Sequence, residues 1–103
     1  MLLPSSTEDI AKFITDNRTE MFIHTVKIIE HAVRNNEPIA EVYRFTDSNY
    51  AVVMQDIDYK ENMDFIFEEL LKLEEYGACV HAKAVKEMTD NLVLKLRTNY
   101  ITK

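Results

Sequence analysis

Cys79 and His81 are the residue types that a cysteine hydrolase uses, a thiolate nucleophile beside an imidazole base. In a helix, however, two residues at this spacing point about 200° apart, at ~100° per residue. In a strand they lie side by side, but the sequence defines no third group and no oxyanion donors. We therefore predict that Cys79 is a structural, half-buried cysteine without a catalytic role.

His24 and His31 are a second pair that could bind a metal or transfer protons. They fall on the same side of one predicted helix, but their seven-residue separation corresponds to about 10 Å at ~1.5 Å per residue. This distance is too long for both imidazoles to bind one metal directly. We interpret the pair as part of a solvated helix face.

The scarcity of glycine and cysteine excludes several kinds of active site. Gly77 is the only glycine, whereas dinucleotide-binding fingerprints, phosphate-binding loops and nucleophile elbows need two or more at fixed spacing. Cys79 is the only cysteine, which excludes a CxxC redox pair and zinc sites built from two or more thiolates of one chain. We therefore expect no cofactor, no metal and no enzymatic activity.

The composition predicts a folded chain that gains from a partner. With 103 residues, 47% hydrophobic and 29% charged, the chain can form one compact domain spanning 1–103 but not two. A domain of this size buries only a modest share of its surface, so we expect a homodimer or a subunit of a hetero-complex. No stretch approaches the length of a membrane span, and the opening residues MLLPSSTEDI lack a basic n-region. Together with the single cysteine, these features predict a soluble, cytoplasmic protein.

Two helices are predicted in the first third of the chain. Ser5 or Ser6 can cap a short helix, whose first turn carries the acidic residues that the helix dipole favours. A second helix is predicted over about 18–35, because its apolar residues fall on one line: Phe22, Val26, Ile29 and Val33. The following NNEP ends it.

A β-hairpin is predicted over 39–57. The segments IAEVYRF and YAVVMQDI are rich in β-branched and aromatic residues, and four turn-forming residues, TDSN at 46–49, separate them. Apolar residues occupy both phases of the second strand, which predicts that parts of both sheet faces are covered.

The last part of the chain predicts a helical hairpin. A helix should run over about 59–76, with Asp58 and Glu61 resembling a capping box and Gly77 available as a left-handed C-terminal cap. For 78–90 a helix is favoured over a strand. Residues 91–103 could extend that helix or form a final short strand, and we favour the strand. The predicted class is therefore α+β, in the order α-α-β-β-α-α-β.

The stretch FEELLKLEEYGACVHAKAVKEM, residues 67–88, resembles the short helix-turn-helix of UVR-type motifs. In that motif an acidic and aromatic turn precedes an alanine-rich second helix. The chain departs from the pattern at Gly77, where the motif normally continues with a helix-favouring residue. The resemblance implies a protein-contact element and no specific activity.

Charge is distributed unevenly along the chain. Residues 56–75 have a balance of −6, which equals the net charge of the whole chain, whereas residues 78–103 have a balance of +3. Such a field steers association with charged partners. Net acidity also argues against direct binding of nucleic acid or an anionic membrane, since both require cationic groups.

Phe65 is the apolar residue that interrupts the acidic face of the 59–76 helix. Relative to Met63 at the centre of the apolar stripe, it falls near 200°, at ~100° per residue, among charged side chains. It is covered either by the C-terminal segment or a second copy, or it is a hydrophobic anchor for a partner. We predict a partner-binding face formed by Glu61, Asp64, Phe65, Glu68 and Lys72.

Three functions are consistent with these features. The first is a small acidic, non-catalytic regulator, adaptor or inhibitor that binds a protein with a basic surface. The second is a nucleic-acid mimic, which would present carboxylates in rows at phosphate-like intervals. The third is a small enzyme with its site at a dimer interface, containing Cys79, His81 or the His24 face. The sequence favours the first.

Overall fold

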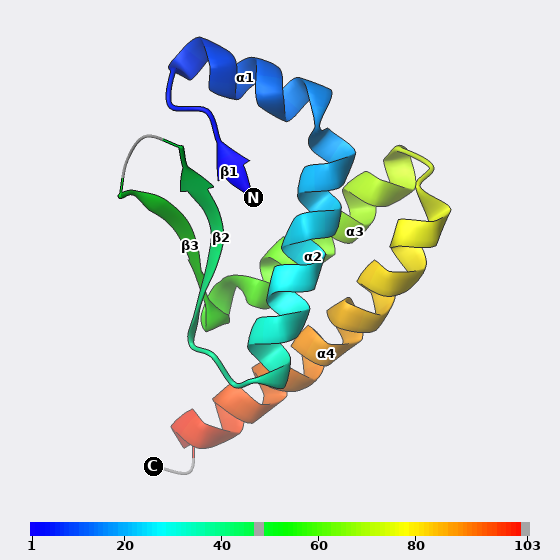
Figure 1. Ribbon diagram of the computed structural model, residues 1–103. Helices are drawn as coiled ribbons and strands as arrows, with labels where there is room; N and C mark the ends of the chain where they lie inside the picture. The colour runs from blue at the N-terminus through cyan, green and yellow to red at the C-terminus, as the bar shows by residue number, and fades with distance from the viewer. Residues whose placement is uncertain (47–48, 102–103) are drawn as a thin grey trace.

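The computed structural model describes residues 1–46 and 49–101, and it describes side chains as far as Leu96. Three long helices pack together, and a small sheet lies beside them (Figure 1). This arrangement confirms the α+β class. The elements, in chain order, are β1 (Leu2–Leu3), α1 (Thr7–Asp16), α2 (Arg18–Arg34), β2 (Ile39–Phe45), β3 (Ala51–Gln55), the 3-10 turn η1 (Asp56–Asp58), α3 (Tyr59–Lys72) and α4 (Tyr76–Ile101).

The N-terminal helices begin and end at the residues that their chemistry favours. The Ser6 side chain accepts a hydrogen bond of 3.1 Å from the backbone N–H of Asp9, so Ser6 is the N-cap of α1. At the end of α2, Asn36 takes a left-handed conformation with φ 53°. The N–H of Glu37 then donates to the carbonyl of Ala32 at 2.9 Å, which satisfies one of the last helical carbonyls.

The sheet has the strand order β1-β2-β3. The predicted hairpin is confirmed: β2 and β3 are antiparallel, with an irregularity at Val42, where Glu41 pairs with Val53 and Tyr43 with Val52. Part of the predicted turn at 46–49 lies outside the described residues. The parallel strand β1 was not predicted, because two residues are too few to show a periodic pattern.

Helices cover only one face of the sheet. Ala40 and Val42 are buried against the helices, whereas Ile39 and Val53 on the other face are 55% and 57% exposed. The apolar residues in both phases of β3 therefore do not reflect burial of both sheet faces within one chain. The face of the hairpin away from the helices keeps exposed apolar side chains.

The helix predicted over 78–90 is confirmed, but the favoured final strand is wrong. Helix α4 continues to Ile101, and residues 102–103 lie outside the described residues. Cys79, Ala82, Val85 and Thr89 recur at helical spacing and are buried, and Leu92 continues the same face against the core. Because the buried face continues beyond Thr89 to Leu92, the last part of the chain packs against the core as a helix and not as a strand.

The turn between α3 and α4 differs from the prediction. Glu74, and not Gly77, takes the left-handed conformation, with φ 58°. The N–H groups of Glu74 and Glu75 donate to the carbonyls of Leu71 and Leu70, a Schellman motif that ends α3 at Lys72. Gly77 lies in the first turn of α4. The predicted capping box is also wrong, since the side chain of Asp58 makes no capping hydrogen bond.

Replacing Gly77 by alanine should raise the free energy of unfolding by about 0.5 to 1 kcal/mol. Alanine has the higher helix propensity, and a Cβ added at Gly77 would meet no atom within 4 Å. Urea denaturation of the two chains measures the difference. A loss of stability would instead indicate that Gly77 needs a conformation only glycine adopts, as the C-cap prediction requires.

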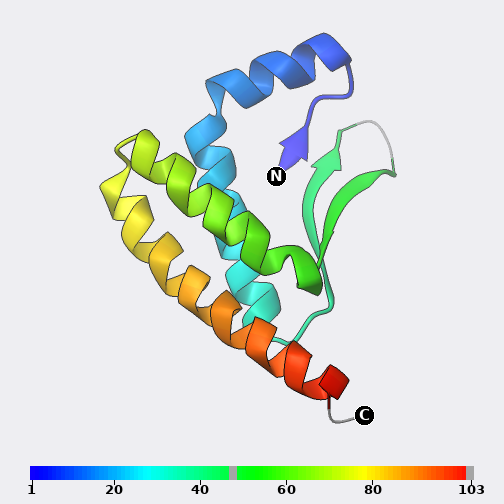
Figure 2. The same cartoon turned by 180° about the vertical axis from the view of Figure 1, so that it is seen from behind.

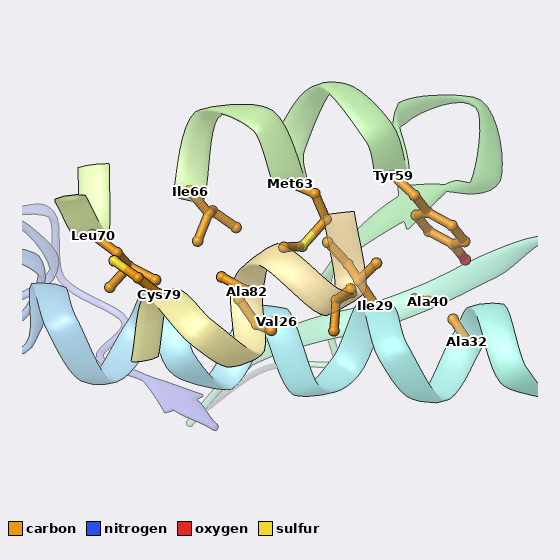
Figure 3. Close-up of a cluster of buried hydrophobic side chains, with 11 residues drawn as sticks. Val26, Ile29, Ala32, Ala40, Tyr59, Met63, Ile66, Leu70, Cys79 and Ala82 are labelled. Atoms are coloured by element: carbon orange, nitrogen blue, oxygen red, sulfur yellow. The ribbon is translucent and has the colours of Figure 1, made fainter. Parts of the chain in front are cut away.

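The core lies where α2, α3 and α4 meet. Figure 3 shows buried side chains from the three helices and from Ala40 of β2 gathered in one cluster. Tyr59 is fully buried, and its hydroxyl donates a hydrogen bond of 2.9 Å to the carbonyl of Glu37. This bond joins the start of α3 to the segment between α2 and β2. The small residues of α4, Ala82 among them, allow it to pack closely against α3.

Candidate protein-binding groove

An apolar groove of about 510 Å³ lies between the helices and the sheet. Helix α3 and strand β3 form its two walls. In Figure 2, α3 passes in front of α2 and the sheet lies to the side. Its floor comes from Met21, Phe22 and Thr25 of α2 and from Val42 and Tyr43 of β2. This volume is in the range of ligand-binding clefts, which are mostly apolar with a few polar groups.

The polar atoms of the floor bind one another. The Tyr43 hydroxyl lies 2.8 Å from Oγ1 of Thr25 and donates to the carbonyl of Met21 at 3.1 Å. Burial raises the pKa of Tyr43, which keeps the phenol neutral. These bonds fasten β2 to α2 and leave a mainly apolar surface above them.

Phe65 projects from α3 at the edge of this groove. It is 53% exposed, as its helical position predicts, and its ring meets Phe22 edge to face with the centroids 6.1 Å apart. The guanidinium of Arg18 lies 5.4 Å from the Phe22 ring centroid and pairs with Glu69 at 3.1 Å. The aromatic pair and its cation therefore line one continuous stretch of the groove, from its floor to the α3 wall.

The structure separates the five residues predicted as a partner-binding face. Glu61 and Glu68 are exposed, and neither makes an ion pair with a residue that the structure describes. Lys72 lies 3.6 Å from Glu69. Asp64 lies on a different flank of α3 from Phe65, because it faces α4.

Asp64 belongs to an ion-pair network between α3 and α4. Its carboxylate lies 2.8 Å from Nζ of Lys60 and 3.7 Å from Nζ of Lys86. Lys60 also lies 3.0 Å from Asp90. The hydrogen bond that Lys60 donates to Asp64, and then the one to Asp90, raises the pKa of Lys60. Asp64 therefore contributes to helix packing and is not directed toward the groove.

Sequence patterns did not identify the other side of the groove. The side chains of Val52 and Met54 on β3 line it opposite Phe65. The only sequence signal was the apolar character of both phases of this strand. The sequence could not predict that β3 and α3 line the same groove, because this depends on how the strand and the helix that follows it are placed in space.

The thiol of Cys79 and the imidazole of His81 lie in different environments. Cys79 is a free, buried thiol in the core, only 6% exposed, and is therefore more buried than predicted. His81 Nε2 lies 3.2 Å from a carboxylate oxygen of Glu30 on α2. This hydrogen bond lowers the pKa of Glu30.

The other two histidines also have separate partners. His24 Nε2 lies 2.7 Å from the carbonyl of Val42, so this ring joins α2 to the sheet. His31 Nε2 lies 3.5 Å from Glu37, near the end of α2. Within the described ranges 1–46 and 49–101, His, Cys, Asp and Glu side chains form no group of three that could hold a metal ion.

No family model matches the chain, and no curated protein or solved structure matches it significantly. Among the residues that the structure describes, no helix is both long enough and apolar enough to cross a membrane.

Proposed function

We propose that the protein is a non-catalytic regulator or adaptor that binds a segment of a partner protein with a basic surface. The observation that carries this proposal is the apolar groove beside the acidic helix α3. An apolar groove contributes burial at the centre of an interface, and the charges around it contribute selectivity and faster association.

The charges near the groove favour a basic partner. Asp58 lines it at the start of α3, and Glu61 follows in the first turn of that helix. The cation in the lining, Arg18, is already paired with Glu69. A lysine or arginine of the partner therefore meets carboxylates, whereas an acidic segment would be repelled.

A nucleic-acid mimic is less well supported by this arrangement. Mimicry requires rows of carboxylates that are free to replace phosphates. Asp64 and Glu69 are paired with cations of the chain, which interrupts such a row on α3. An interface enzyme is also less well supported, since His24, Cys79 and His81 do not line the groove.

The setting that we propose for this function is the cytosol, where a buried free thiol such as Cys79 stays reduced. The partner would bind as one member of a hetero-complex, with the groove covered in the assembled state.

The proposal is tested by selecting binders from a displayed library of random 12-residue peptides. We expect the enriched peptides to combine apolar residues with lysine or arginine. Replacing both Glu61→Lys and Glu68→Lys should slow their association by about tenfold and weaken its salt dependence, because exposed charges act mainly through steering.

Glu87→Lys is the matched control, a charge reversal at an exposed position of α4. It should change association much less than the double replacement on α3. Enrichment of acidic peptides, no enrichment at all, or equal effects of the two reversals would contradict the proposal.

A further inference from the structure

We infer that the partner segment binds in an extended conformation, as an added strand on the open edge of β3, with alternate side chains placed in the groove against Phe65. This inference rests on the proposed function and specifies the form of the ligand.

The hydrogen bonds at the two ends of β3 determine which of its residues face outward. The carbonyl of Tyr50 accepts from the N–H of Phe45, and the N–H of Asp56 donates to the carbonyl of Pro38. In an antiparallel pair, residues alternate between facing the neighbouring strand and facing away from it. The backbone groups of Ala51, Val53 and Gln55 therefore point away from β2.

No strand of the described sheet pairs with that side of β3, because the strand order is β1-β2-β3. The edge also lacks the usual protection against pairing. Its sequence, AVVMQ, contains no charged residue and no proline, and Val53 is exposed. Three residues with outward backbone groups can form the main-chain hydrogen bonds by which extended peptides join sheet edges.

The edge and the groove lie together, which determines the side-chain pattern of the ligand. Residues that pair across a sheet point to the same face. Ligand residues opposite Val52 and Met54 would therefore point into the groove, whose other wall carries Phe65. The residue opposite Val53 would point to the outer face. A bound segment would thus have apolar residues at alternate positions.

Charge favours a basic partner segment over a second copy of the chain. Beyond Gln55 the chain continues with Asp56 and Asp58, and Glu61 follows, so this end of the edge is acidic. Pairing two copies through β3 would bring together two chains with a net charge of −6 each. A segment with lysine or arginine beyond the residue that pairs with Gln55 would instead be attracted.

The test uses the most enriched 12-residue peptide from the library selection. Each of its backbone amides is N-methylated in turn, and the affinity is measured by titration. Strand addition requires only every second amide, so we expect at least tenfold weaker binding on methylation at alternate positions and little change at the positions between them.

A peptide whose apolar residues follow helical spacing, or losses that do not alternate, would overturn strand addition while leaving the proposed function intact. Failure to enrich any peptide would count against the proposed function itself. Sedimentation showing a dimer of the free chain that Val53→Pro dissociates would show that a second copy, and not a basic partner, occupies the edge.

Val53→Pro also tests the edge from the protein side. It removes an outward N–H that β2 does not use, so we expect the hairpin to remain and binding to fall at least tenfold. Val53→Thr keeps the N–H and should bind as the native chain does. Unchanged binding by a folded Val53→Pro chain would overturn the inference, and the methylation series decides independently if this variant does not fold.

Discussion

Replacing Phe65 by alanine should weaken binding of the selected peptide by about 2 kcal/mol or more, which is roughly a thirtyfold loss of affinity. In the proposed complex the partner would cover the exposed half of the ring, so truncation would remove burial at the centre of that interface. The free energy of unfolding should fall by only about 1 kcal/mol, because the free chain loses mainly the edge-to-face contact with Phe22. Titration and urea denaturation measure the two effects.

Tyr76→Ala is the matched control for this prediction. Tyr76 is also an exposed aromatic side chain on a helix, but it does not line the groove. Its replacement should leave the affinity unchanged. If Phe65→Ala instead costs about 3 to 5 kcal/mol of stability and leaves binding intact, Phe65 belongs to the core.

Replacing Tyr59 by alanine should lower the free energy of unfolding by about 3 to 5 kcal/mol, a large part of the stability of a domain of this size. The side chain is fully buried, and its removal leaves a cavity where α3 meets α2 and β2. Tyr59→Phe keeps the ring and removes only the hydroxyl that donates to Glu37. It should cost about 1 to 3 kcal/mol, because the Glu37 carbonyl loses its partner.

Thermal and urea denaturation of both variants check this order of effects. Equal losses for Tyr59→Ala and Tyr59→Phe would mean that the hydrogen bond, and not the packing of the ring, holds the start of α3. Little change in either variant would contradict the position of Tyr59 at the centre of the core.

Much of the fold could be predicted because its elements have clear periodic patterns. Helix α2 and the hairpin have apolar residues at the periods of a helix and of strands, and both occur where predicted. The end of α4 was harder, because Leu92, Val93, Leu94 and Leu96 fit either pattern. Packing of Leu92 against the core, a contact between distant parts of the chain, decides for the helix.

The prediction of the turn between α3 and α4 from the conformational preference of glycine was also wrong. Glycine is the usual residue for a left-handed cap, which made Gly77 the expected position. The structure instead places Glu74 in that conformation, and α4 begins early enough to include Gly77. The packing of Leu70 and Cys79 in one core cluster fixes where each helix ends and begins, and this outweighs the preference of a single residue.

The candidate site was only partly predictable. The exposure of Phe65 followed from its position on the helix, but its aromatic neighbour Phe22 lies on α2, and the opposite wall lies on β3. The acidic residues predicted around it are divided by tertiary structure, since Asp64 turns to Lys60 and Lys86. A helical wheel describes one element, whereas the groove is formed by several.

The most direct test of a binding groove is a map of side-chain methyl signals by nuclear magnetic resonance as the selected peptide is added. We expect shifts at Val42, Val52, Met54 and Ile66, which line the groove, and none at Val80 or Leu94 on the exposed side of α4. Shifts confined to α4, with the groove methyls unchanged, would contradict it.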